Sequence, residues 1–119
     1  MIIQSKRVWT AGQFIPAQLE ISGRKISRIL PWGSLAPDED YENRRILPGF
    51  IDIHTHGAYG FDTNDGDPEG LRYWMEHIPR EGVTAVLPTT VTDLPHVLTK
   101  AAANVAAVMK EGYCGAEIL

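Results

Sequence analysis

The stretch that decides the fold is residues 48–57, which read Pro-Gly-Phe-Ile-Asp-Ile-His-Thr-His-Gly. Pro-Gly punctuates the chain, and the apolar run at residues 50–53 predicts a strand covered on both faces, as in a parallel sheet. Residues two apart on a strand point to the same side. We therefore expect His54 and His56 to project together from the carboxyl end of this strand, where two imidazoles can bind one divalent metal ion.

A His-x-His pattern alone is weak evidence, because it also arises by chance. Its position at the end of a buried strand strengthens it, since active sites of parallel sheets and barrels lie at the carboxyl ends of strands. Asp52 has the same parity as both histidines. It could orient a ligand histidine from behind or serve as a structural partner of nearby groups, and the residues alone leave both open.

Beyond this strand, helix and strand patterns alternate. Apolar spacing predicts a helix over residues 68–81, capped by Asp67, then a strand over 83–91, a helix over 94–110 and a strand from 116. This order implies parallel strands with right-handed crossovers, in a doubly wound sheet or a (β/α)₈ barrel. A barrel needs about 250 residues, so this chain would hold only its beginning. The apolar stripe of the second helix comprises Leu94, Val97, Leu98, Ala101, Val105, Val108 and Met109.

Residues 1–47 have a different character, with three short strand patterns and turn residues. Gly23-Arg24 predicts a two-residue hairpin turn. Ile26 and Ile29 fall out of phase in the third strand, which a bulge would explain. Residues 31–45 are rich in Pro, Gly and acidic residues and predict a loop. The chain is thus expected to divide into a β-rich segment, 1–47, and a βα segment, 48–119.

The composition narrows the class of protein. The 119 residues are 44% hydrophobic with a net charge of −4, which is typical of a soluble globular protein and disfavours nucleic acid as a partner. The single cysteine excludes an internal disulfide. The sequence has no signal-peptide pattern and no apolar run of about 18 residues, so we expect a cytoplasmic protein that does not interact with a membrane.

The motif at residues 48–57 resembles the first barrel strand of the amidohydrolase superfamily, whose members hydrolyse amides with one or two metal ions in a (β/α)₈ TIM barrel. Residues 56–62 and 82–90 resemble the loop after that strand and the second barrel strand of one group, the N-acetylglucosamine-6-phosphate deacetylases. The resemblance implies that residues 1–47 belong to a small flanking β-sandwich. Residues 48–119 would then be the first two βα units and the start of the third strand of the barrel.

This resemblance also implies a reaction. The deacetylases convert N-acetylglucosamine 6-phosphate to glucosamine 6-phosphate and acetate with a divalent metal, expected to be zinc, as one or two ions. His54 and His56 match the metal ligands of their first strand. The other ligands and the catalytic aspartate are expected beyond Leu119, so no catalytic residue is assigned in this chain. The 119-residue piece alone should be inactive, and the complete enzyme a homodimer that binds a small amino-sugar phosphate.

Two alternatives stay open. The chain could belong to another amidohydrolase, of the dihydroorotase, hydantoinase or adenine deaminase type, or it could be a small non-catalytic α/β domain with incidental histidines. We expect His77 and His96 to be solvated surface residues. Four further residues are weaker candidates for lining the site because they follow the first or second predicted strand: Tyr59, Asp62, Thr89 and Thr90.

Overall fold

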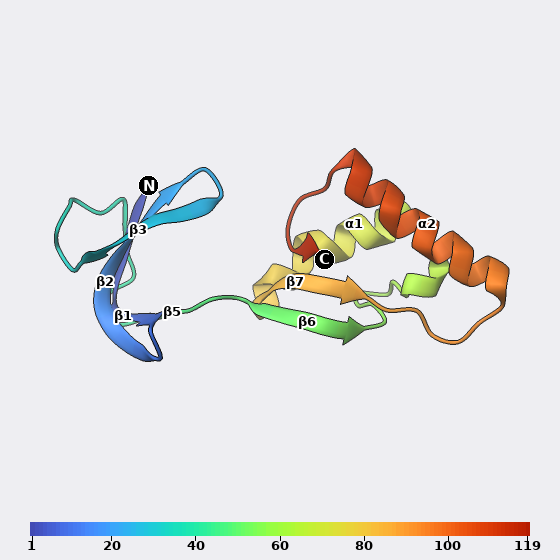
Figure 1. The fold of residues 1–119 in the computed structure, drawn as a ribbon, viewed down its shortest axis with the longest axis horizontal. Coiled ribbons are helices and arrows are strands. Elements are labelled where there is room, and N and C mark those ends of the chain that lie inside the picture. Colours follow the sequence, from blue (N-terminus) through green and yellow to red (C-terminus); the bar gives the residue numbers. More distant parts are fainter. The chain divides into compact units, whose positions relative to one another are not determined.

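Strands occupy the first part of the chain, and helices enter only after the histidine motif (Figure 1). The computed structural model describes residues 1–119 and divides them into two units, Met1–Pro48 and Gly49–Leu119. The first unit is built of strands, and the second alternates strands with helices. The chain as a whole therefore has the α/β character that its sequence predicts. None of its helices combines the length and the apolar character needed to cross a lipid bilayer.

The first unit is a five-stranded sheet in the order β3-β2-β1-β4, with β5 also paired to β1. The three long strands form an antiparallel meander, and Gly23 has a φ of 60° in the predicted hairpin turn between β2 and β3. The two short strands pair in parallel with β1 and lie within the segment 31–46, most of which was predicted as loop. Strands of two residues are too short to show periodicity. The bounds are Ile2–Thr10 (β1), Gln13–Ser22 (β2), Lys25–Pro31 (β3), Glu39–Asp40 (β4) and Arg45–Ile46 (β5).

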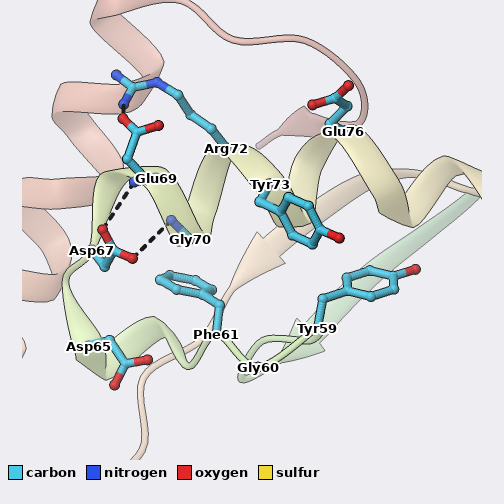
Figure 2. A pocket seen from close by; sticks show the side chains of 10 residues that line it. All are labelled: Tyr59, Gly60, Phe61, Asp65, Asp67, Glu69, Gly70, Arg72, Tyr73 and Glu76. Atoms are coloured by element: carbon cyan, nitrogen blue, oxygen red, sulfur yellow. Dashed lines mark hydrogen bonds and ion pairs between the residues drawn. The ribbon is translucent and has the colours of Figure 1, made fainter.

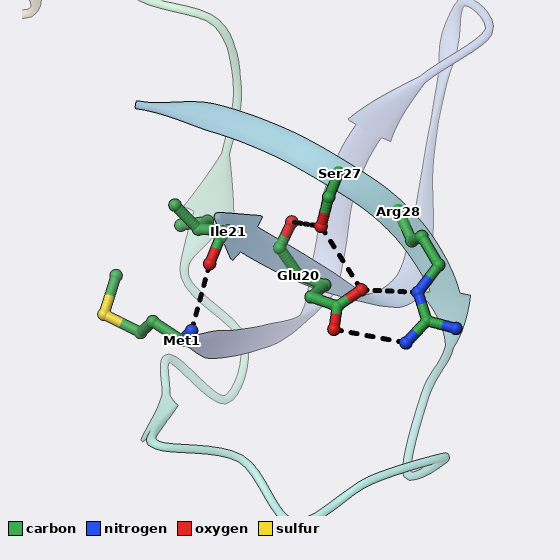
Figure 3. Close-up of polar contacts among 5 residues, drawn as sticks. All are labelled: Met1, Glu20, Ile21, Ser27 and Arg28. Carbon is green, nitrogen blue, oxygen red and sulfur yellow. Dashed lines mark hydrogen bonds and ion pairs between the residues drawn. The ribbon is translucent and has the colours of Figure 1, made fainter. Parts of the chain in front are cut away.

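The predicted bulge is present in β3. Glu20 pairs with Arg28 and Ile21 pairs with Ile26, so Ser27 is the extra residue. Figure 3 shows how its hydroxyl holds the bulge, by donating to the Glu20 backbone carbonyl at 3.0 Å and to the Glu20 carboxylate at 3.2 Å. The extra residue restores the phase of the strand, and both isoleucines of β3, Ile26 and Ile29, line one small apolar hollow.

Buried amide groups hold the long segment after β3 against this sheet. Gln18 is fully buried, and its amide nitrogen donates to Gln4 Oε1 and to the Leu35 carbonyl, both at 2.7 Å. Its oxygen accepts from the Leu35 backbone N–H at 3.0 Å. Gln4 in turn donates to Asp40 Oδ2 at 2.8 Å. Since each buried amide is satisfied, the segment is fixed by hydrogen bonds rather than by apolar packing.

The second unit contains a parallel sheet in chain order, β6-β7-β8, with α1 and α2 packed on it (Figure 1). Its core joins both helices to β7 and β8 through Leu71, Trp74, Met75, Val86, Val108 and Ile118. The strands are Phe50–Thr55 (β6), Val83–Pro88 (β7) and Glu117–Ile118 (β8), and the helices are Pro68–His77 (α1) and Pro95–Glu111 (α2). Two 3₁₀ turns, η1 at Thr63–Asp65 and η2 at Ile78–Glu81, complete the unit.

Helix α1 begins as predicted but ends earlier. Asp67 accepts from the N–H groups of Glu69 and Gly70, at 3.1 and 3.0 Å. The α-helix stops at His77 and continues as η2, because Pro79 has no N–H to donate to the carbonyl of Met75 four residues earlier. That carbonyl instead accepts the N–H of Ala116 at 2.9 Å, which ties the start of β8 to the helix.

The predicted covering of β6 on both faces is wrong for this chain. Phe50, Ile51 and Ile53 are 63%, 60% and 72% exposed. The strand is an edge of its sheet, and the core lies over β7 and β8. The predicted stripe of α2 is likewise too wide, because Leu94 and Met109 are exposed. A hydrophobic pattern marks every side that could be buried, whereas only one side of each element meets a partner here.

Candidate metal centre

His54 lies near the carboxyl end of β6, and His56 follows the strand directly. The centroids of their rings are 5.2 Å apart, with an angle of 78° between the ring planes. Rings on opposite sides of a strand could not approach so closely, so both project to the same side, as the spacing predicts. Both histidines are exposed. Both residues can therefore be reached from solvent.

The ring of His56 is held by the neighbouring strand. Its Nδ1 lies 3.0 Å from the backbone carbonyl of Thr89, just after β7. A carbonyl can only accept, so Nδ1 carries a proton, and in the neutral ring the lone pair is on Nε2. The Thr89 N–H donates to the Thr55 carbonyl at 2.8 Å, which extends the pairing of the two strands to this point. A metal-binding histidine commonly donates its second ring nitrogen to such a carbonyl.

Asp52 acts on the backbone and not on a histidine ring. Its Oδ1 accepts the N–H of His54 at 3.1 Å. Of the two roles left open for this carboxylate, the geometry favours the structural one.

The loop after His56 is shaped by glycine and by a 3₁₀ turn. Gly57 has a φ of 140°, and a Cβ at this position would lie 2.1 Å from the Phe61 carbonyl oxygen. Asp62 then caps η1 by accepting the N–H of Asn64 at 2.8 Å. The buried Thr63 donates twice to the His56 carbonyl, from its N–H at 2.7 Å and its hydroxyl at 2.9 Å. Thr63 thus holds the backbone of His56, while the Thr89 carbonyl holds its ring.

Asn64 links this loop to the one that follows β7. Its Nδ2 donates to the Val91 carbonyl at 3.1 Å and to Asp93 Oδ2 at 3.2 Å, and its Oδ1 accepts the Val91 N–H at 3.0 Å. The N–H of Leu94, and then the Asn64 amide, hold the pKa of Asp93 below its usual value. We did not identify Thr63 or Asn64 from the sequence. The only local signal was the capping pair Asp62 and Asp65 that frames them.

A surface depression of the second unit is distinct from the histidines. It has a volume of about 560 Å³ and lies between the loop at residues 59–61 and α1 (Figure 2). Tyr59 and Tyr73 line it, and a hydrogen bond to Glu81 raises the pKa of the Tyr59 hydroxyl. Carboxylates dominate its polar lining, and neither His54 nor His56 belongs to it. It therefore does not suit an anionic ligand.

Two other histidines had been expected on the surface. His96 is exposed, as predicted. His77 is more buried than predicted. Its ring stacks on that of Tyr73, with 3.9 Å between the centroids, and its Nδ1 donates to the Tyr73 carbonyl at 2.8 Å. Neither adjoins the histidine pair in any observed contact.

The donor set fits part of a divalent metal site. Two imidazoles on one side of a strand are suitable ligands for zinc, which takes three protein ligands in catalytic sites and four in structural ones. No group of three or more His, Cys, Asp or Glu residues is arranged to hold a metal within residues 1–119. His54 and His56 could therefore supply two ligands, and further ligands would have to come from elsewhere.

Comparison with known proteins finds several deacetylases of amino-sugar phosphates. No family model matches the chain. An N-acetylgalactosamine-6-phosphate deacetylase of Escherichia coli O157:H7 is 33% identical over 119 residues, which cover 99% of this chain and 31% of that protein. An N-acetylglucosamine-6-phosphate deacetylase of Bacillus subtilis is 39% identical over 77 residues, 62% of this chain and 19% of that protein. The chain thus spans a third or less of the length of these relatives.

A solved structure gives the same result for the fold. The crystal structure of an N-acetyl-D-glucosamine-6-phosphate deacetylase from Mycobacterium smegmatis superposes with a TM-score of 0.83 at 21% identity, over 99% of this chain and 35% of that one. At this identity the likeness concerns the fold. Together, the sequence and structure comparisons identify the chain as similar to part of an amino-sugar-phosphate deacetylase.

Proposed function

We propose that the chain is the first part of a metal-dependent deacetylase that hydrolyses N-acetylglucosamine 6-phosphate to glucosamine 6-phosphate and acetate. The observation that carries the proposal is the same-side histidine pair at the carboxyl end of β6, with the His56 ring bonded to the end of the adjacent parallel strand. The sequence relatives named for that activity, and for the related activity on the galactosamine sugar, support the choice of substrate class. We further propose a cytoplasmic homodimer for the complete enzyme.

The fold proposal follows from strand order. In the second unit the strands are parallel neighbours in the order of the chain, β6-β7-β8, with a helix between each pair. A (β/α)₈ barrel keeps this sequential order, whereas a doubly wound sheet reverses it at a switch point. We therefore infer that residues 48–119 open a TIM barrel and that the antiparallel unit, residues 1–47, contributes to a flanking β-sandwich.

In this proposal His54 and His56 hold a divalent metal ion, which we expect to be zinc, with one or two ions in the complete enzyme. When bound, such an ion polarises a carbonyl and lowers the pKa of water, which is the chemistry needed to cleave an amide. The task of this chain is to orient ligands. The Thr89 carbonyl holds the proton of His56 on Nδ1 and so presents Nε2, while Asp52 fixes the backbone of His54.

The test is acetate release by the full-length protein from the 6-phosphates of N-acetylglucosamine and N-acetylgalactosamine. Removing the metal with a chelator should abolish the release, and zinc should restore it. Loss of an outer-shell partner costs about 10–100-fold, so His56→Ala, which removes a ligand, should lower activity by at least about 100-fold. His96→Ala, at an exposed histidine of α2, is the matched control and should be silent.

Other outcomes would reject the proposal. Turnover of dihydroorotate, hydantoin or adenine, without acetate release from either sugar phosphate, would assign the chain to another amidohydrolase. Full activity of the protein after chelation, or of His56→Ala, would show that no metal at this site is needed for the reaction. Because the chain offers only two ligands, we also propose that the 119-residue piece alone is inactive. Acetate release by that purified piece would contradict this.

A further inference from the structure

The two histidines of the proposed site are not held equally. The carbonyl of His56 accepts two hydrogen bonds from Thr63, a residue that is 2% exposed, and the His56 ring is bonded to the Thr89 carbonyl. His54 is held through its backbone N–H by Asp52. The fold therefore fixes the ring orientation of His56 more firmly than that of His54. How well it does so depends on the loop that carries Thr89.

Besides the bond from the Thr89 N–H to the Thr55 carbonyl, that loop has a side-chain brace. The side chain of Asn64 makes a donor–acceptor pair with the backbone of Val91, which is two residues after Thr89, and a third bond to Asp93. The pattern fixes the orientation of the amide, because the Val91 N–H must meet its oxygen and the Val91 carbonyl its nitrogen. Residues 62–65 in turn form the capped turn that anchors the backbone of His56.

We propose that Asn64 is a positioning residue for His56. Its side chain bonds to Val91 and Asp93 and makes no hydrogen bond to the His56 ring. It holds the segment 89–93 where the Thr89 carbonyl meets Nδ1 of His56, and so keeps the lone pair on Nε2, the nitrogen available to a metal. The inference rests on the proposed function for the identity of the ligand, but the tautomer of His56 follows from the hydrogen bond alone.

The consequence is measurable as metal affinity. Removing an outer-shell partner of a metal-binding histidine lowers affinity about 10–100-fold. In the full-length protein, Asn64→Ala should weaken the binding of one Co²⁺ or Zn²⁺ ion by that factor and alter the visible absorption of bound Co²⁺. In the metal-free protein, the ¹⁵N shifts of the His56 ring should change from the Nδ1–H tautomer toward a mixture.

Lys100→Met is the matched control. Lys100 donates to the Asp65 carbonyl at 2.8 Å and so braces the same 3₁₀ turn from α2, without a hydrogen bond to residues 89–93. It should leave metal affinity and the His56 tautomer unchanged. A second pair of variants guards against simple misfolding. Asn64→Asp places a second carboxylate beside that of Asp93 and should weaken metal binding. The double variant, which also carries Asp93→Asn, removes the repulsion and should recover part of the lost affinity.

Each outcome decides a point. Wild-type affinity, absorption and tautomer in a folded Asn64→Ala protein would overturn the positioning role and leave the proposed function intact. If Asn64→Ala does not fold, failure of the double variant to recover affinity relative to Asn64→Asp would overturn the role equally. If His56→Ala binds the metal ion as tightly as the wild type does, the proposed function is rejected, and this inference with it.

Discussion

Replacing Gly57 by alanine tests whether the backbone directly after His56 is as tightly constrained as the structure indicates. Gly57 has a φ of 140°, and a Cβ built on it would lie 2.1 Å from the Phe61 carbonyl oxygen and 3.0 Å from Asp62 Cα. Gly60, three residues on, also has a positive φ, 81°, but its Cβ would meet nothing within 4 Å. Alanine at either position would have to adopt a positive φ, but only at Gly57 would its Cβ collide with other atoms.

The magnitude follows from these two contributions. A left-handed conformation costs an L-residue about 1–2 kcal/mol, which is the loss expected for Gly60→Ala. Gly57→Ala carries a similar cost plus the collision with backbone atoms, which cannot rotate away as a side chain can. Overpacking of this kind costs about 1–3 kcal/mol. The gap between the two variants should therefore be about 1–3 kcal/mol in the free energy of unfolding.

Urea denaturation of both variants, followed by far-UV circular dichroism, measures this gap. Metal affinity should fall only in Gly57→Ala, since relief of the collision must move the backbone beside His56 or the Thr63 bonds to its carbonyl. Equal stability of the two variants would refute the reasoning, and so would a Gly60→Ala protein that is the less stable of the pair.

Two further predictions concern the first unit. Gln18→Leu should destabilise the protein by about 1–3 kcal/mol, because it leaves part-buried backbone groups of Leu35 without partners. The control Gln13→Leu, at an exposed position of the same strand, should change the free energy of unfolding by less than about 0.5 kcal/mol. Equal losses for the two variants in denaturant titrations would contradict this. The Glu42 N–H, and then Gln4, lower the pKa of Asp40 from 3.8. The ionised form is therefore favoured by folding, its contribution is complete above about pH 4, and it is lost as the pH falls through the lowered pKa. Wild type should exceed Asp40→Asn in stability at neutral pH, and the gap measured from denaturation midpoints should close below pH 3.8; a constant gap across that range would show that ionisation plays no part.

The sequence predicted features that depend on local chemistry. The cap at Asp67 and the turn at Gly23 are properties of single residues, and the structure has both. The parity of His54 and His56 follows from strand geometry, and their rings lie together. The bulge was predicted from two isoleucines out of phase, and the pairing of β2 and β3 places it at Ser27.

Features that depend on distant partners were not predictable. The burial of an apolar side chain depends on what packs against it, so Ile53 and Leu94 fit their patterns and are still exposed. Thr63 and Asn64 are ordinary polar loop residues in the sequence. Their roles arise from hydrogen bonds to His56 and to Val91, which lies 27 positions from Asn64. No periodicity signals such a contact. The metal role of the histidine pair itself remains a prediction.

The chain-order arrangement of β6, β7 and β8 bears on how the protein assembles during synthesis. Each strand pairs with the one made just before it, as Phe50 pairs with Val83 and Ala85 with Glu117. With partners about 33 residues apart and translation at about 5–20 residues per second, each new strand leaves the ribosome roughly 2–7 seconds after its neighbour. The His56–Thr89 contact can therefore form as soon as Thr89, just after β7, has emerged, so the geometry of the histidine pair can be set early in folding.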